Sequence, residues 1–447
     1  MTIIQSDEFD LYWEKNTKQK EDSKTEKTVK KIIKQVRERG DAAVKKYASK
    51  FDKSSPQRLE VPLSQLKRAY DELRANDPEL TEALEFAADN INRFSRKQRE
   101  QFADFEYETQ AGIFTGQRVI PVRRAAVYVP GGRFPLFSSV LMGLIPAFNA
   151  GVEEIVFSSP PEKDGLPSPK ILAAAAIAAK IAGSIEIKEN EINKKFRVFA
   201  VGGAQSIAAL AYGTESVPCV DVIAGPGNRF VTAAKRLLYG QVGIDFLAGP
   251  SDVLIIADND HTAKAVDFTA ADVLAQAEHD PDARARVLVP NMEFAKQIAV
   301  AIEKQLTVME TAKTARESLK NGGLIVVYNN REEAIRIAEK IAPEHLELQT
   351  SDDLSWVPHL KNYGSLFIGG LSAEVLGDYS AGLNHTLPTL SSARFTGGLS
   401  VRHFLKTVTT LRCKDGEGYE KTRNAAEILA RAEGLEGHAL SALRRKV

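Results

Sequence analysis

The chain contains very little cysteine: Cys219 and Cys413 are the two among 447 residues. Two thiols that match no metal-binding spacing exclude a disulfide-stabilised scaffold and favour a reducing compartment. Long apolar runs are also missing, because no stretch approaches the roughly 18 residues of a membrane-spanning helix. The amino terminus has neither the basic start nor the apolar core of a secretion signal. We therefore expect a cytoplasmic protein with no membrane partner.

Net charge is absent as well. The chain has 59 Lys+Arg and 59 Asp+Glu residues, so its formal charge is zero. A balanced surface gives no general attraction for nucleic acid or for an acidic membrane, and we expect neither as a partner. The lysines between Lys18 and Lys34 are interleaved with glutamates, which indicates a solvated helix face rather than a basic patch. A length of 447 residues, with 43% hydrophobic residues, allows two or more cores.

From Ala125 onward the sequence alternates short apolar runs with helical patterns. Each run is followed by glycine or proline, as expected where a strand ends and a turn begins. Strands that alternate with helices predict an α/β fold built on parallel sheets with crossover helices. The predicted strands cover residues 125–129, 155–158, 196–201, 220–224, 253–257, 285–289 and 324–328.

Helix signals are clear in two places. Apolar residues at helical spacing lie between 29 and 36, with lysine and arginine among them, and Gly40 is placed to end that helix. A second helix is predicted over 168–183, where Ser168 can cap the first turn, Pro169 suits its first position and the interior is rich in alanine.

A carboxylate and an imidazole are adjacent at Glu344 and His345, directly after Pro343. Histidine titrates near neutral pH, and burial can raise the pKa of a glutamate, so this pair can divide base and acid work. We expect the pair at a helix-to-loop junction. The alternative interpretation is a solvated glutamate beside a histidine of the core, and the dipeptide alone does not decide between the two.

Three further segments place histidine among polar residues, although the chain has only seven histidines. Gln276 and His279 are three residues apart, which puts both on one face of a helix and lets them share one ion. Asp378 and His385 lie in a segment broken by glycines, where functional groups concentrate in loops.

Glu433 and His438 end a helical pattern near the carboxyl terminus and form the third segment. Nitrogen and oxygen ligands without thiolate suit Zn²⁺ in an open site, with Mn²⁺ and Co²⁺ as less favoured choices. For each histidine taken singly, a structural role in the core is the competing interpretation.

Seven segments, in this order along the chain, resemble those of the histidinol dehydrogenase family. They are Val-Tyr-Val-Pro-Gly-Gly (127–132), Val-Gly-Gly-Ala-Gln (201–205), Ala-Gly-Pro-Gly-Asn (224–228), Leu-Ala-Gly-Pro-Ser (247–251), Ala-Gln-Ala-Glu-His (275–279), Ala-Pro-Glu-His-Leu-Glu (342–347) and Gly-Asp-Tyr-Ser-Ala-Gly-Leu-Asn-His-Thr-Leu-Pro-Thr (377–389).

The resemblance implies a role for each matching residue. It implies one Zn²⁺ per subunit, bound by Gln276, His279, Asp378 and His438. It implies that Glu344 and His345 are the catalytic pair, and that NAD⁺ contacts Tyr128, Gln205 and Asn228. The substrate would contact the four zinc ligands and His345, together with Ser251, His385 and Glu433.

The reaction implied is a four-electron oxidation that consumes two NAD⁺ in succession. An amino alcohol becomes an aldehyde and then a carboxylate, with L-histidinol and L-histidine as the expected substrate and product, as in histidine biosynthesis. His345 would take the alcohol proton, and Glu344 would activate the water that adds to the aldehyde. The hydride chemistry belongs to the cofactor.

The resemblance also implies a domain organisation of two incomplete Rossmann-like domains, one inserted in the other. Residues 1–127 and 248–390 would form the outer domain with an N-terminal helical segment, and residues 128–247 the inserted domain. Residues 391–447 would form a helical tail that crosses to a second subunit. A homodimer with shared active sites follows, because Glu433 and His438 would come from the tail of the partner.

Two other functions remain open from the sequence. Arg133, Phe134 and the segment 394–400 resemble the sister sulfopropanediol dehydrogenases, which oxidise a sulfonated diol with the same metal and catalytic residues. The planar fork of an arginine suits a sulfonate, although Arg133 could equally contact the cofactor pyrophosphate or a surface carboxylate. The second alternative is a zinc hydrolase in which Glu344 activates a metal-bound water.

Overall fold

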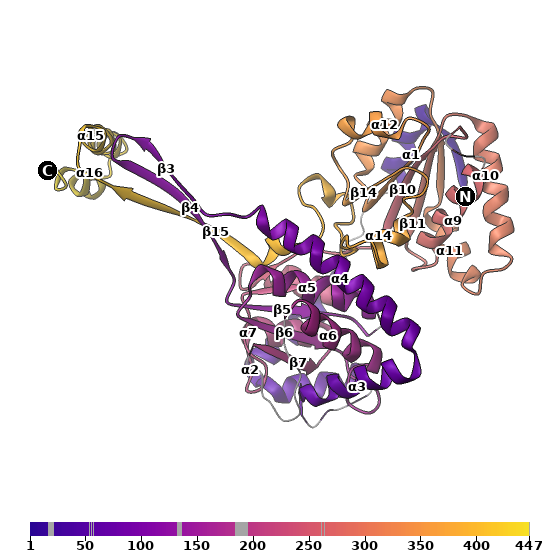
Figure 1. Ribbon diagram of the computed structural model, residues 1–447, viewed down its shortest axis with the longest axis horizontal. Coiled ribbons are helices and arrows are strands. Elements are labelled where there is room, and N and C mark those ends of the chain that lie inside the picture. The colour runs from indigo at the N-terminus through magenta and orange to yellow at the C-terminus, as the bar shows by residue number, and fades with distance from the viewer. Residues whose placement is uncertain are drawn as a thin grey trace.

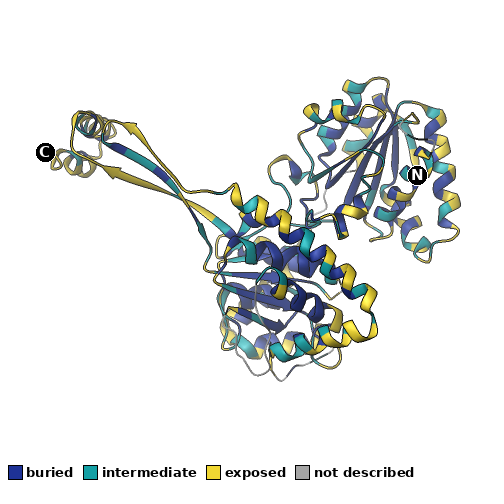
Figure 2. Cartoon of the chain, viewed as in Figure 1, coloured by how far each residue is buried: buried dark blue, intermediate teal, exposed yellow. Residues whose placement is uncertain are grey.

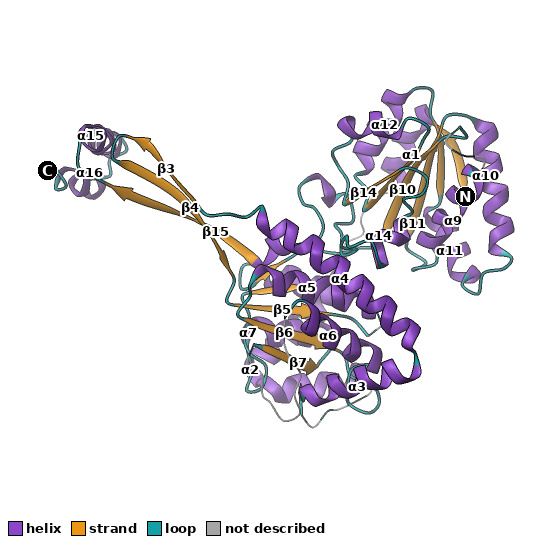
Figure 3. Cartoon of the chain, in the orientation of Figure 1, coloured by secondary structure: helices purple, strands orange, loops and turns teal. Residues whose placement is uncertain are grey.

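The computed structural model describes residues 1–16, 22–52, 54, 56, 58–131, 136–183, 195–260, 262 and 264–446. Two α/β domains lie next to each other, and a long arm extends from one of them to the carboxyl terminus (Figure 1). In both domains the strands form a central sheet between helices (Figure 3). The predicted α/β class, with parallel-sheet domains, an N-terminal helix and C-terminal helices, is confirmed.

The outer domain is built on a parallel sheet with the strand order β1-β12-β11-β10-β13-β14. Its strands are β1 (Thr2–Gln5), β10 (Asp252–Ala257), β11 (Arg284–Val289), β12 (Leu324–Val327), β13 (His345–Gln349) and β14 (Ser365–Ile368). Its helices are α1 (Phe9–Asn16), α9 (Ala265–Ala277), α10 (Met292–Leu306), α11 (Ala312–Gly322), α12 (Arg331–Ile341), α13 (Asp353–Trp356) and α14 (Glu374–Tyr379).

The inserted domain contains a second sheet, ordered β2-β7-β6-β5-β8-β9, in which β2 alone pairs antiparallel among the described strands. Its strands are β2 (Glu60–Val61), β5 (Arg124–Tyr128), β6 (Glu154–Ser159), β7 (Phe196–Ala200), β8 (Val222–Ala224) and β9 (Gly243–Ile244). Its helices are α2 (Ser23–Phe51), α3 (Leu63–Asn76), α4 (Pro78–Glu100), α5 (Phe137–Ala150), α6 (Pro169–Ile181), α7 (Gly203–Tyr212) and α8 (Arg229–Leu238).

The arm is an antiparallel sheet with the order β15-β4-β3, followed by two helices at its far end (Figure 1). Its elements are β3 (Phe105–Gln110), β4 (Ile113–Pro121), β15 (Leu405–Cys413), α15 (Glu417–Ala432) and α16 (Glu436–Leu443). Most of the arm is exposed, whereas the two sheets are buried (Figure 2). The strand β15 falls within the predicted helical tail, and its side chains are exposed or half-buried, so they produce no apolar pattern.

Both central sheets bury side chains on both faces, which explains why their strands read as continuous apolar runs. Along β10, Val253 and Ile255 join the core beneath α9 and α10, while Leu254 joins the core beneath α12. In β5, Val127 faces α5 and α6, and Tyr128 faces α2 and α7. Alternate residues of a strand point to opposite faces, so each strand contributes to two cores.

The N-terminal helices differ from the predicted division of the domains. Residues 1–127 were expected in the outer domain, but α2, α3 and α4 pack on α7, α6 and α5 of the inserted domain. The reason is the apolar stripe of α2, because Val29, Ile32 and Val36 are buried in the core of the inserted sheet. Within residues 1–127, β1 and α1 join the outer sheet.

Gly40 bends a helix instead of ending it. Its backbone has φ 49 inside α2, and the chain returns to helical geometry on both sides. The positive φ is open to glycine at little cost, and Glu215 accepts a hydrogen bond from the main-chain N–H of Asp41 at 2.7 Å. Gly132, Arg133, Phe134 and the predicted charged segment 184–195, except residue 195, lie outside the described residues. In the part of the chain that is described, no helix is long and apolar enough to cross a membrane.

Close packing between α5 and β5 gives a test of the inserted core. Gly143 is buried in α5, and a methyl group there would overlap Cγ1 of Val127. We expect Gly143→Ala to lower the free energy of unfolding by about 1–3 kcal/mol, because overpacking outweighs the gain in helix propensity. Thermal or urea unfolding measures the effect. Val127→Ala in the same chain should recover part of the loss, and simple additivity of the two changes would contradict the contact.

Candidate active site

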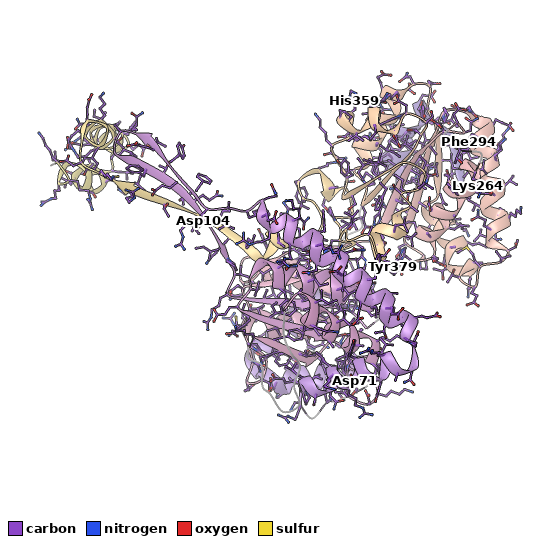
Figure 4. All side chains as sticks on the ribbon, in the orientation of Figure 1. Asp71, Asp104, Lys264, Phe294, His359 and Tyr379 are labelled. Atoms are coloured by element: carbon purple, nitrogen blue, oxygen red, sulfur yellow. The ribbon has the colours of Figure 1, made fainter. Side chains whose placement is uncertain are left out.

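A cavity of about 200 Å³ lies between the two domains. Tyr379, which is labelled in Figure 4, stands on the outer domain where it faces the inserted domain. The cavity is lined from the outer domain by Ser251, His279, Glu344, His345, Asp378, Tyr379, His385, Thr386, Leu387 and Thr389, and from the inserted domain and its connections by Leu136, Ser138, Ser139, Pro226, Gly227, Phe246, Ala248 and Gly249.

The predicted catalytic pair lies at the start of a strand. Helix α12 ends at Ile341, and Ala342 adopts φ 48, a left-handed conformation that is uncommon outside glycine. Pro343 and Glu344 follow, and His345 is the first residue of β13, paired with Val253 of β10. The expected helix-to-loop junction is therefore a helix-to-strand junction. A strand of a buried sheet fixes the imidazole more firmly than a loop would.

Glu344 is buried, with 4% of its surface exposed. Its Oε2 accepts a hydrogen bond from the main-chain N–H of Asp252 at 3.0 Å, and its own N–H donates to Oδ1 of Asp252 at 3.0 Å. Burial raises the pKa of Glu344 to about 8, and the negative charge of Asp252 adds to the rise, while His345 acts against it. A carboxylate with a raised pKa is a stronger base than an exposed glutamate.

His345 is surrounded by carboxylates. Its Nε2 lies 3.2 Å from Oδ1 of Asp378, and its Nδ1 lies 3.7 Å from Oε2 of Glu374. Burial alone would lower the pKa of His345, but Glu374, Glu344 and Asp378 together outweigh it and hold the pKa well above the usual range. These carboxylates stabilise the protonated imidazole, which makes its neutral form a stronger base toward a neighbouring hydroxyl group than a free histidine would be.

Two of the predicted zinc ligands, His279 and Asp378, come together beside this pair, and a third, Gln276, lies one helical turn before His279. Gln276 is fully buried near the end of α9, which packs against α14, and His279 follows just after the helix. Ligand atoms of His279, Glu374 and Asp378 lie within 4.8 Å of one another. Both polar atoms of the Gln276 side chain lack a hydrogen-bond partner among the described residues. A buried amide without partners has the donor and acceptor groups that a bound ion or ligand would satisfy.

Ser251 and His385 line the same cavity, as the sequence predicts. Nδ1 of His385 lies 2.8 Å from the main-chain oxygen of Asp378, and its Nε2 lies 2.9 Å from Oγ of Ser139 on α5. A carbonyl oxygen only accepts, so Nδ1 carries the proton and Nε2 accepts from the serine hydroxyl. His385 thus bridges the outer and inserted domains.

The remaining two predicted residues lie elsewhere in the chain. Glu433 follows α15 and His438 is part of α16, so both are at the far end of the arm, away from the cavity (Figure 1). Both side chains are exposed. Within one chain they do not join the other site residues.

The three predicted cofactor contacts line a second pocket, of about 470 Å³. Tyr128 ends β5, Gln205 lies in the first turn of α7 and Asn228 caps α8 by accepting from Phe230 and Val231. The Tyr128 hydroxyl accepts from the N–H of Gly203 at 3.1 Å. All three follow parallel strands at their carboxyl ends, where open α/β sheets bind ligands.

Sequence reasoning missed several buried charged residues of the site. Glu374 lies within the ligand cluster, and its N–H donates to Oε1 of Glu347 at 2.7 Å. Gln349 joins Glu347 to Asp272 through its Nε2 at 2.7 Å each. The sequence does carry a signal for them, because Leu-Glu-Leu-Gln places two polar residues in a strand of a buried sheet. Buried polar groups need partners, so this pattern predicts further polar residues close by.

The histidinol dehydrogenase family model matches residues 15–446. The chain is 43% identical to histidinol dehydrogenase of Aquifex aeolicus over 94% of this chain and 92% of the relative. It is also 43% identical to histidinol dehydrogenase of Thermus thermophilus over 94% of each chain. A crystal structure of histidinol dehydrogenase from Elizabethkingia anophelis superposes with a TM-score of 0.88 at 32% identity, covering 99% of this chain and 97% of that one.

Asp52 gives a test of the second pocket. Burial raises the pKa of Asp52 from 3.8 to about 6, and a hydrogen bond from Gln205 opposes the rise only in part. The folded state therefore holds this proton more tightly than the unfolded state, so stability is lost as the pH rises through about 6. Between pH 4 and pH 8, the free energy of unfolding of Asp52→Asn should rise by on the order of 1 kcal/mol relative to that of the wild type, as measured by urea unfolding.

Asp22 of the same pocket is the matched control. Hydrogen bonds from Thr25 lower the pKa of Asp22, so the charged form of Asp22 stabilises the wild type as the pH rises. The free energy of unfolding of Asp22→Asn should therefore fall relative to that of the wild type with rising pH. The same sign for both variants would contradict this account of the pocket.

Proposed function

Because the chain belongs to the histidinol dehydrogenase family, we propose that it oxidises L-histidinol to L-histidine through the aldehyde, with two NAD⁺ and one Zn²⁺ per subunit. The observation that carries the proposal is the meeting of the Glu344–His345 pair with His279 and Asp378 at one cavity, with the unpartnered buried amide of Gln276 one helical turn before His279. A pocket that fits a dinucleotide lies at the carboxyl edge of the neighbouring sheet.

The residues present fit zinc. The imidazole of His279, the carboxylate of Asp378 and the unpartnered buried amide of Gln276 offer nitrogen and oxygen donors, and His438 of a second subunit would complete a set of four. When bound, zinc holds the imidazole and amino nitrogens of the substrate and so fixes the position of its hydroxymethyl carbon. His385 and Ser251 line the rest of the cavity and orient the substrate further.

NAD⁺ would occupy the pocket formed by Tyr128, Gln205 and Asn228. The amino end of α8 carries the positive end of the helix dipole, which suits the pyrophosphate. Pro226 and Gly227 line the catalytic cavity, and Asn228 lines this pocket. One short segment therefore borders both, as hydride transfer from substrate to nicotinamide requires.

The two residues of the catalytic pair act in different steps. In the first oxidation His345 takes the hydroxyl proton while hydride leaves the carbon for NAD⁺. In the second, Glu344 takes a proton from water as its oxygen bonds to the aldehyde carbon, and the hydrated carbon then gives hydride to a second NAD⁺. In total one alcohol, two NAD⁺ and one water give one carboxylate, two NADH and three protons.

A homodimer with shared active sites accounts for the position of the arm. Glu433 and His438 are exposed at its end, and neighbouring apolar side chains are exposed as well, among them Leu411, Ile428 and Leu429. Apolar surface of this kind supports contact with another protein surface. The arm of one copy would bring the fourth zinc ligand to the cavity of the other.

The direct test of the proposed function measures NADH absorbance with the purified chain and L-histidinol. We expect two NADH per histidinol, and loss of the reaction on chelation with recovery when Zn²⁺ is added. Gln276→Leu should lower zinc content and histidinol affinity together, because the buried amide leaves the ligand set.

His345→Asn is the matched comparison. It should retain zinc and lower kcat by about 10² to 10⁴ fold, since it removes a base but no ligand. If the protein turned over sulfopropanediol faster than histidinol, sulfopropanediol would become the proposed substrate in place of histidinol. If no amino alcohol or diol gave NADH and the protein instead hydrolysed an ester or an amide, the dehydrogenase proposal would be wrong and the protein would be a zinc hydrolase.

Complementation tests the shared site. His345→Asn and His438→Ala each disable the site in their own homodimer. In a mixed dimer, the cavity of the His438→Ala chain receives an intact arm from the other chain, so one complete site returns. We expect activity to reappear when the two inactive proteins are unfolded, mixed and refolded together. If the mixture stays inactive although dimers form, each site is completed within one chain.

A further inference from the structure

Asp252 and Arg286 have no assigned catalytic role, and together they fix the position of the Glu344 carboxylate. Asp252 is the first residue of β10, and Glu344 directly precedes the adjacent strand β13. Each donates its main-chain N–H to the carboxylate of the other, at 3.0 Å in both directions. This reciprocal pair of hydrogen bonds fixes Oε2 of Glu344, while Oε1 accepts no hydrogen bond from the described residues.

The second oxygen of Asp252 is also engaged. Its Oδ2 accepts from Nη1 of Arg286 at 2.8 Å, and Arg286 comes from the next strand, β11. Asp252 and Arg286 are 7% and 4% exposed, so this ion pair is buried. The guanidinium lies 5.2 Å from the centre of the Trp13 ring of α1, which covers its outer side. With both carboxylate oxygens bonded, Asp252 has no freedom to rotate away from Glu344.

The Asp252–Arg286 ion pair does more than stabilise the outer sheet. A buried ion pair is often no more stabilising than apolar residues of the same volume, so its retention calls for another benefit. Here its neighbour is a carboxylate that lines the cavity, and small displacements of a reacting group lower rates strongly. The negative charge of Asp252 also favours proton uptake by Glu344.

We propose that Asp252 and Arg286 are positioning residues that hold the Glu344 carboxylate for the water-dependent oxidation of the aldehyde. The inference rests on the proposed function, in which His345 acts in the first oxidation and Glu344 in the second. It therefore predicts a loss that falls on one half-reaction. A purely structural role would lower both half-reactions to the same extent.

The test uses L-histidinal and the zinc-loaded protein in two assays. Oxidation of histidinal by NAD⁺ needs water and Glu344, whereas reduction of histidinal by NADH reverses the first step and needs neither. The variant D252A/R286M removes the acceptor for the Glu344 N–H and both buried charges, so no charge is left unpaired. We expect kcat for aldehyde oxidation to fall at least about tenfold, with aldehyde reduction within about threefold of wild type.

The variant D252N/R286Q is the matched control. It also removes both charges, but Asn at position 252 still offers an oxygen to the N–H of Glu344. We expect it to lower aldehyde oxidation less than D252A/R286M does, with aldehyde reduction within about threefold of wild type. Melting temperature and zinc content are measured for every variant. If D252A/R286M does not fold, Arg286→Lys retains the charge but not the stacked, planar guanidinium, and it should lower aldehyde oxidation alone by at least about threefold.

Equal losses in the two assays would overturn the inference, as would equal losses in D252A/R286M and D252N/R286Q. Wild-type rates for D252A/R286M in both assays would also overturn it. These outcomes require a wild-type protein that performs both reactions. A wild-type protein that performs neither would instead refute the proposed function, so the two failures are distinguishable.

Discussion

The structure depends on the crowding of ionisable groups at the amino edge of the outer sheet. Glu344, His345, Glu374 and Asp378 are all less than a tenth exposed. Carboxylates held this close in a medium of low dielectric repel one another, and isolated burial of each would be costly. His345 compensates part of the negative charge. A divalent cation at Gln276, His279 and Asp378 would compensate the rest, so metal binding and the stability of this edge are coupled on the proposed function.

The two sheets use opposite edges for the two halves of the chemistry. In the inserted domain Tyr128, Gln205 and Asn228 follow strands at their carboxyl ends, in agreement with the general rule for open α/β sheets. In the outer domain Glu344 and His345 stand at the amino end of β13. Because the domains face each other at these edges, the segment from Pro226 to Asn228 borders both the cavity at Glu344 and the pocket at Tyr128, which the proposed function assigns to substrate and dinucleotide.

The parts of the fold that could be predicted are those with a strong local signal. Seven strands buried on both faces read as apolar runs, and all seven are present, within one or two residues at most ends. The strands β3 and β15 were missed because their side chains lie largely exposed and give no apolar pattern, and β4 between them was missed because its few buried residues are separated by half-buried or exposed ones, most of them polar. The packing of α2 on α7 was missed for another reason, since an apolar stripe shows that a helix is buried but not against which sheet.

Some residues of the candidate site could likewise be predicted from the sequence, and others could not. Motif resemblance predicts Glu344, His345 and the ligand residues as site residues. Asp252, Arg286 and Glu374 reach the same region through contacts between neighbouring elements that no local pattern records.

The arm presents the remaining problem, because a single chain gives it no function. Its sheet is joined to the body through β4 and β15, and its far end holds α15 and α16 packed mainly on each other. An exchange of identical arms about a twofold axis is the simplest closed arrangement, since each copy then gives and receives the same surface. On the proposed function, zinc in a separated chain would have three protein ligands, and the fourth would arrive only with the partner. Dimer formation and metal affinity would then be linked, because whatever binds the assembled state more tightly also stabilises it.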